Sequence, residues 1–200
     1  VKLHEKAYKE GDEEAIEMVL LGLEKFGSDF MQENVLDSLE RIAPPEATED
    51  LLAMAEKRNK QAIRILGRIG AEDALDTIEE YVEGGDMALR KVTWRAIGAI
   101  GQTRSTQVVA NQLADENAEV RSTAARALGL LGDTRAIDPL ADVLAEDEAD
   151  EVRASAAWAL NRIGTERALA AAADYADDRA YLVQHEASQA ADALSVEPTA

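Results

Sequence analysis

The chain has 200 residues and a mass of 21.6 kDa, which is enough for one domain or two small ones. Its 40 acidic and 21 basic side chains give a formal net charge of -19, which opposes binding of the whole molecule to nucleic acid or to anionic lipid. Cysteine is absent, which excludes disulfides, thiolate zinc sites and thiol nucleophiles. Apolar residues make up 46% of the chain and aromatic residues only 4%, which favours closely packed helices over disorder or a sheet sandwich.

A repeat runs through most of the chain, and its clearest mark is a block that ends in glycine. The terminal glycines Gly70, Gly101, Gly132 and Gly164 lie 31, 31 and 32 residues apart. Weaker copies of the pattern extend towards both ends of the chain. In chain order, the repeat units are predicted at 12–43, 44–70, 71–101, 102–132, 133–164 and 165–194, all in a single domain, with a frayed tail at 195–200.

Each unit reads as helix A, a turn, helix B and a turn that ends in glycine. In the unit 133–164, Asp133 or Thr134 can cap helix A, and an acidic stretch at 146–151 forms the turn. Gly164 suits the left-handed position that ends helix B. Further first helices are expected at 12–23 and 46–55, and a last second helix at 182–194. One such pair cannot bury its apolar face alone, so the pattern predicts an all-α right-handed superhelix of about six stacked pairs.

The pattern of Val-Arg, small residues, Ala-Leu-Gly, a Gly-Asp turn and Arg-Ala-Ile-x-Pro-Leu resembles HEAT-like repeats, and most closely the short repeat of phycobilisome lyases. The match is strong over 71–164. This resemblance implies that the B helices line the concave face of the superhelix. It fixes function poorly, because such solenoids carry out many unrelated tasks.

The composition carries a second resemblance. All seven lysines lie at or before Lys91, whereas acidic residues are spread over the whole chain. An even acidic coat with little lysine and abundant alanine is similar to the proteins of salt-accumulating haloarchaea. The first residues show no signal-peptide pattern, and no apolar run approaches the length of a membrane span, so we expect a cytoplasmic, halophilic protein.

Arginines recur on the side of the B helices that faces away from the apolar stripe. Stepping by one repeat places Arg64, Arg95 and Arg126 in one position, which Trp158 occupies in the next unit. The set predicted to bind a partner is completed by neighbouring positions on the same face: Arg68, Arg162, Lys60 and Lys91. Arg and Trp often anchor protein interfaces, so this ridge predicts binding of an acidic or carboxylate-rich protein segment. The alternative is that the cations pair with carboxylates of their own chain.

Other conspicuous residues are assigned structural roles. Arg90, Arg121 and Arg153 each follow the apolar residue that opens helix B, where we expect them to bond turn carbonyls or carboxylates of neighbouring units. Gln184 replaces this arginine in the last unit, which suggests that the series ends there. Trp94 is expected to pack between repeats.

Catalytic chemistry has little support in the sequence, and we predict a non-catalytic adaptor with no cofactor and no metal. The pair His185-Glu186 resembles the His-Glu motifs that hold iron in deoxyhypusine hydroxylase, but the preceding units lack the pair. The alternatives left open are a bilin-lyase-like enzyme or enzyme subunit, a His-Glu metal hydroxylase, and nucleic-acid binding through the arginine ridge. The sequence does not indicate the oligomeric state.

Overall fold

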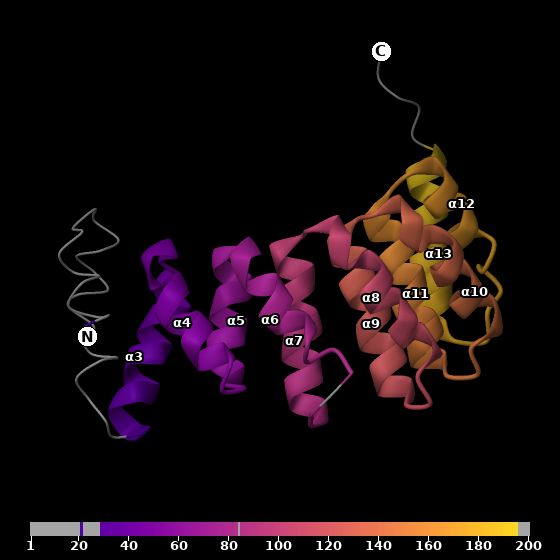
Figure 1. Ribbon diagram of the computed structural model, residues 1–200. Helices are drawn as coiled ribbons and strands as arrows, with labels where there is room; N and C mark the ends of the chain where they lie inside the picture. Colours follow the sequence, from indigo (N-terminus) through magenta and orange to yellow (C-terminus); the bar gives the residue numbers. More distant parts are fainter. Residues whose placement is uncertain (1–20, 22–28, 84, 196–200) are drawn as a thin grey trace, which may run out of the picture.

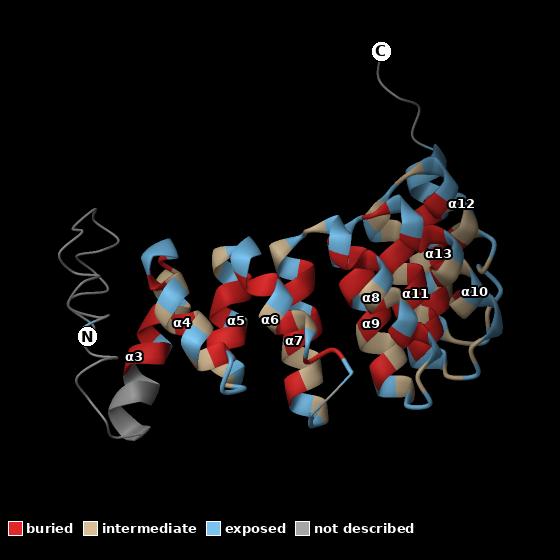
Figure 2. Ribbon diagram, viewed as in Figure 1, coloured by how far each residue is buried: buried red, intermediate tan, exposed pale blue. Residues whose placement is uncertain are grey.

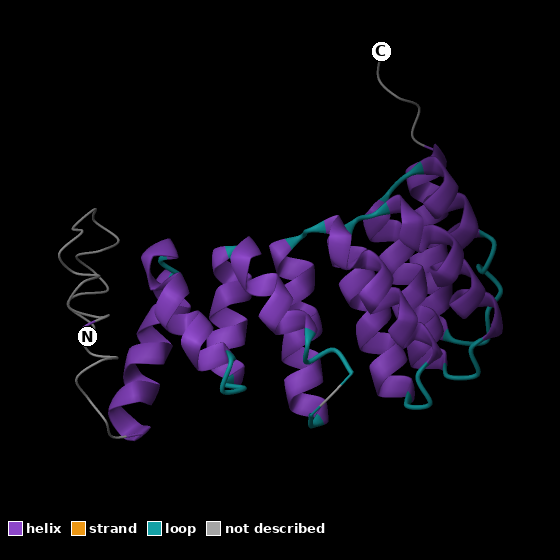
Figure 3. Cartoon of the chain, viewed as in Figure 1, coloured by secondary structure: helices purple, strands orange, loops and turns teal. Residues whose placement is uncertain are grey.

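The computed structural model describes residue 21, residues 29–83 and residues 85–195. Within these residues the chain consists of helices joined by short turns, and it contains no strand (Figure 3). None of the described helices has the length and apolar character needed to cross a membrane. The prediction of an all-α fold is therefore confirmed.

The helices follow one another in pairs from the N-terminal to the C-terminal end of the molecule (Figure 1). Helix α3, Asp29–Ile42, precedes five pairs and packs against α5. The A helices are α4 (Thr48–Ala55), α6 (Leu75–Glu79), α8 (Thr106–Ala110), α10 (Ile137–Glu146) and α12 (Glu166–Ala173). The B helices are α5 (Lys60–Ile69), α7 (Met87–Ile100), α9 (Ala118–Leu131), α11 (Asp150–Ile163) and α13 (Tyr181–Ser195).

Each predicted unit from 44 to 194 contains one of these pairs, except that α13 continues to Ser195. The helix expected at 12–23 lies outside the described residues, apart from Leu21. The predicted tail begins at Ser195, which is the last residue of α13, and the rest of that tail is also outside the described part.

The apolar stripes of the helices meet in one continuous core. Leu51 of α4 and Ile63 and Leu66 of α5 are fully buried, and Leu140 of α10 and Leu160 of α11 are equally buried in a later pair. Figure 2 shows the buried residues on the inner sides of the helices along the stack. Successive B helices also pack directly on one another, from α5 to α7, α9, α11 and α13. Each B helix therefore presents its remaining exposed side next to that of its neighbours.

The glycine-ended turns are as predicted. Gly70, Gly101, Gly132 and Gly164 follow α5, α7, α9 and α11 with φ values of 76°, 76°, 66° and 70°, in the left-handed region that favours glycine. Most A helices begin differently from the expectation, because a short 3-10 turn precedes the α-helix. Asp133 caps the 3-10 turn at Thr134–Ala136, while α10 itself starts without a side-chain cap.

A ladder of arginines, Arg90, Arg121 and Arg153, ties successive units together, as the sequence predicted. Arg121 donates two hydrogen bonds to Asp147 of the following turn (2.7 and 2.9 Å) and one to the carbonyl of Asp115 in its own turn (2.9 Å). Arg153 repeats this arrangement with Asp178.

The ladder changes at both of its ends. Arg90 reaches Asp115 (2.9 Å) and its guanidinium lies over the ring of the buried Trp94, 5.0 Å from its centroid. Trp94 packs in the core, as expected. Gln184 donates to the carbonyl of Asp178 in its own turn (2.6 Å), so it keeps the contact with its own turn without the charge pair.

Asp133 joins α8 to the turn that follows α9. Its carboxylate accepts hydrogen bonds from Nε of Arg135 (2.8 Å), from the backbone N–H of Arg135 (2.9 Å) and from the hydroxyl of Thr106 (2.7 Å). The hydrogen bond from the Arg135 side chain is the main reason that the pKa of Asp133 falls to about 2, since it and the other two donors outweigh the opposing effect of burial.

We expect Asp133→Asn to be less stable than the native protein at pH 7, and we expect this difference to shrink as the pH falls from about 4 towards 2. The pKa of Asp133 in the folded state lies below that of an unfolded aspartate, so its carboxylate contributes fully above about pH 4 and loses that contribution as it is protonated. Urea unfolding of both proteins at neutral and acid pH measures the difference. A difference that stayed constant into strong acid would contradict this assignment.

Candidate protein-binding surface

The B helices bring the predicted partner-binding residues to one face, where three adjoining hollows form a row. The first hollow lies between α5 and α7 and has a volume of about 250 Å³. The second, of about 240 Å³, involves α7, α9 and α11, and the third, of about 350 Å³, involves α9, α11 and α13. Arg95 lines both the first and the second hollow, and Arg126 and Trp158 line both the second and the third. We call this continuous row the B-helix groove.

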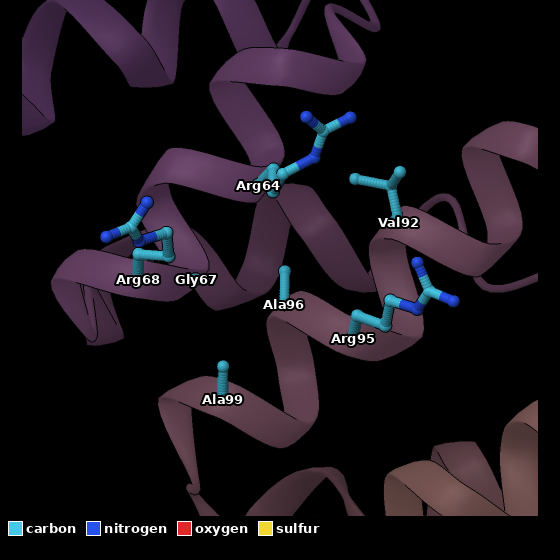
Figure 4. A pocket seen from close by; sticks show the side chains of 7 residues that line it. All are labelled: Arg64, Gly67, Arg68, Val92, Arg95, Ala96 and Ala99. Carbon is cyan, nitrogen blue, oxygen red and sulfur yellow. The ribbon is translucent and has the colours of Figure 1, made fainter. Parts of the chain in front are cut away.

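Arginines surround the first hollow. Its floor is formed by small side chains, with Gly67 on α5 and Ala96 and Ala99 on α7. Figure 4 shows Arg64, Arg68 and Arg95 around this floor, with their guanidinium groups pointing away from one another. Separate guanidinium groups of this kind suit several carboxylates along a chain better than one small anion held at a single point.

Trp158 lies at the centre of the groove and is held by two arginines. The guanidinium carbon of Arg126 is 4.7 Å from the centroid of the Trp158 ring, and that of Arg162 is 6.0 Å away. Both distances are within the range of cation–π attraction. The repeat phase places this indole on the side that faces away from the apolar stripe, whereas in the structure it is half-buried and packs against the core. The pairing with Arg126 follows from their equivalent positions in adjacent units.

Three of the predicted binding cations form ion pairs within the chain. Lys60 pairs with Asp86 at 3.4 Å, Arg64 pairs with Glu40 at 3.1 Å, and Lys91 pairs with Glu119. For these three residues the structure has the intramolecular pairing that the sequence left open as the alternative. Arg64 lines the first hollow, whereas Lys60 and Lys91 line none of the three, and the charge of each of these cations is compensated by its partner.

The other four predicted cations, Arg68, Arg95, Arg126 and Arg162, are exposed and form no ion pair among the described residues. Most other arginines of the described chain do have a carboxylate partner: Arg90, Arg104, Arg121, Arg135, Arg153, Arg167 and Arg179. In a chain with 40 acidic side chains, three arginines without a carboxylate partner among the described residues, Arg68, Arg95 and Arg126, thus line the groove, and Arg162 lies beside its Trp158.

The glycines of the Ala-Leu-Gly blocks inside the B helices have a packing role that the sequence pattern was not used to predict. A Cβ atom on Gly67 would lie 2.7 Å from Cα of Ala96, and one on Gly129 would lie 2.7 Å from Cα of Ala159. A Cβ on Gly98 would lie 2.9 Å from Leu130. These three glycines occupy the same position in successive units, so they let neighbouring B helices approach closely. Glycine is unfavourable inside a helix, so its regular recurrence at this position of the B helices was the sequence signal for a close helix contact.

Asn161 takes the position of these glycines in α11. Its amide nitrogen donates to the backbone carbonyl of Glu186 and to the Glu186 carboxylate, each at 2.8 Å. His185, the neighbour of Glu186, is exposed; its Nε2 lies 2.7 Å from Nε2 of Gln189, and its ring stacks on Tyr181. The described residues contain no group of three or more side chains that could together hold a metal ion.

Comparisons with known proteins agree with this architecture. The family described as HEAT repeats matches residues 106–192. Human deoxyhypusine hydroxylase in complex with glycerol is similar in structure, with a TM-score of 0.55 and 22% identity over 92% of this chain and 75% of that chain. A designed armadillo repeat protein in complex with the peptide (KR)4 has a TM-score of 0.58 and 18% identity over 89% of this chain and 98% of that chain.

The complex of CpcE and CpcF of phycocyanin lyase from Nostoc is also similar, with a TM-score of 0.55 and 19% identity over 91% of this chain and 65% of that chain. The sequence matches no curated protein. The family match over residues 106–192, these structural similarities and the stacked helix pairs show that the chain has an α-solenoid fold similar to that of HEAT-repeat proteins.

Proposed function

We propose that this protein is a non-catalytic adaptor that binds an acidic, carboxylate-rich segment of a protein partner in the B-helix groove. The observation that carries the proposal is the gathering of Arg68, Arg95, Arg126 and Arg162 on one face without carboxylate partners among the described residues. An arginine presents a planar fork of hydrogen-bond donors that matches a carboxylate. A carboxylate of the ligand stabilises the complex most where the arginine has no carboxylate partner in its own chain.

Two further features support a protein segment as the ligand. The groove is built on packed helices, so little ordering is needed when a partner binds. Trp158 and the arginines beside it are the residue types that most often anchor interfaces. Among the structural neighbours, the designed armadillo repeat protein is in complex with a basic peptide, (KR)4. The arginines that line the groove here favour the opposite charge in its ligand.

The net charge of -19 sets a condition on this binding. The protein as a whole repels an acidic partner, and the same repulsion acts on nucleic acid. At an ionic strength of about 0.15 M this field is screened within about 8 Å. Contacts in the groove then decide the affinity, with the apolar and indole contacts contributing most at high salt.

We expect the double variant Arg95→Glu/Arg126→Glu to lose the protein partners that the native chain captures from an extract of its own cells. Both residues line the second hollow, so the two substitutions place like charges against an acidic segment. The matched control is Arg104→Glu/Arg167→Glu, which changes the charge equally at two exposed arginines whose partners are Asp76 and Asp138. Recovery of the same partners by the groove variant would show that the groove is not the interface.

A further inference from the structure

The charge of the B-helix groove changes from one end to the other. At the α5–α7 end, the first hollow is lined by Arg64, Arg68 and Arg95 and by no acidic residue; because Arg64 pairs with Glu40, the uncompensated charge there is that of Arg68 and Arg95. At the α11–α13 end, the third hollow is lined by Glu151 and Glu186. The groove therefore has a cationic end and an acidic end, in a fixed order along the stack.

Apolar side chains lie beside Arg95 and Arg126 in the middle of the groove and continue into the third hollow. Leu130 of α9 is 38% exposed and lines the second hollow, and Leu182 of α13 is 60% exposed and lines the third. Trp158 lies in both hollows. Exposed leucines beside an indole offer an apolar surface for side chains of a bound segment.

The two glutamates at the acidic end remain available to a cation. Glu151 is exposed in the first turn of α11 and forms no ion pair among the described residues. Glu186 accepts one hydrogen bond from Asn161 through Oε2, which leaves further acceptor sites on its carboxylate. Arg126 lines the same hollow, but it is stacked on Trp158 and pairs with neither glutamate.

We infer that the groove selects its ligand by charge order. The ligand is an extended segment with carboxylates at the α5–α7 end, apolar side chains over Trp158, and a lysine or arginine at Glu151 and Glu186. This inference rests on the proposed function and adds to it the order of side chains in the bound segment. Four helix-to-helix steps of about 8–10 Å each correspond to roughly ten residues of extended chain.

A double-mutant cycle with synthetic peptides tests this order. The probe is a peptide with blocked ends and the sequence DEDSLSLSK, and a second probe has its lysine replaced by methionine. Their affinities are measured by fluorescence anisotropy at low ionic strength for the native protein and for Glu151→Gln. Glu148→Gln is the matched control, because Glu148 lies in the same turn region but does not line the groove.

We expect the change from lysine to methionine in the probe to weaken binding about three- to fivefold for the native protein and for Glu148→Gln. For Glu151→Gln the same change in the probe is expected to alter the affinity less than twofold. An equal loss in the native protein and in Glu151→Gln would overturn the inferred charge order, because the lysine would then have no partner at Glu151.

The proposed function is distinguished by a further arm with Arg95→Glu/Arg126→Glu. If the probe depends on these arginines but its lysine does not couple to Glu151, the groove remains the binding surface and only the charge order is wrong. If binding of the probe is indifferent to both the arginines and Glu151, the charge order and the proposed binding surface are both overturned.

Discussion

Replacing Arg153 by methionine should lower the free energy of unfolding by about 3–5 kcal/mol, the range for breaking one partner of a buried charge pair. The side chain of Arg153 is only 6% exposed and that of its partner Asp178 is 10% exposed. The guanidinium donates two hydrogen bonds to Asp178, each of 2.9 Å, and one to the carbonyl of Asp147. Methionine preserves much of the volume, but it leaves a buried carboxylate without a counter-charge.

Urea unfolding measures this effect, and an exposed pair provides the control. Arg167 pairs with Asp138, and their side chains are 64% and 73% exposed, so Arg167→Met should cost no more than about 1 kcal/mol. The double variant Arg153→Met/Asp178→Leu should recover much of the loss, since it removes the uncompensated charge. Equal, small effects of Arg153→Met and Arg167→Met would show that the ladder does not stabilise the stack.

A second large effect is expected at Gly129, where the substitution Gly129→Ala should destabilise the protein by about 1–3 kcal/mol. The added Cβ would lie 2.7 Å from Cα of Ala159 and 2.9 Å from both Cβ of Ala159 and the ring of Trp158. The Cα atom belongs to the backbone of α11 and the Cβ of Ala159 is bonded directly to it, so neither can rotate away and α9 and α11 must move apart. Thermal unfolding measures the loss of stability. Near-ultraviolet circular dichroism measures the change in the packing of the Trp158 ring.

Helix propensity alone predicts the opposite sign at this position, because alanine is favoured over glycine in a helix by about 1 kcal/mol. Ala170, exposed in α12 and away from the groove, serves as the reference. There the reverse change, Ala170→Gly, should cost about that amount. An increase in stability for Gly129→Ala would contradict the close approach of the helices.

The repeat phase was the most informative property of the sequence. It predicted that Arg126 and Trp158 would be neighbours although they are 32 residues apart, and the guanidinium lies 4.7 Å from the ring centroid. It also predicted the bonding of Arg121 and Arg153 to adjoining turns. Both successes have one physical reason: residues at equal positions in stacked units must lie side by side, and the chain length between them is irrelevant.

Local pairing within the groove could not be predicted in the same way. Arg64 bonds Glu40, which lies in α3, where the repeat pattern is weak and gives no reliable phase. The pairs of Lys60 with Asp86 and of Lys91 with Glu119 join residues at different positions of adjacent units, so equal repeat phase does not predict them. The A helices were predicted, but the short length of some of them, such as α6, was not, because tertiary packing decides how a marginal helix ends. The halophilic character and the cytoplasmic location stay predictions.

The glycines at 67, 98 and 129 have a consequence for the shape of the solenoid. They shorten the separation of successive B helices, while the A helices make little direct contact with one another. A stack whose members are closer along one side bends towards that side, so the missing methyl groups set a radius of curvature. Substitutions at Gly98 and Gly129, which line none of the three hollows, would therefore change the curvature of the stack without changing the lining of the groove.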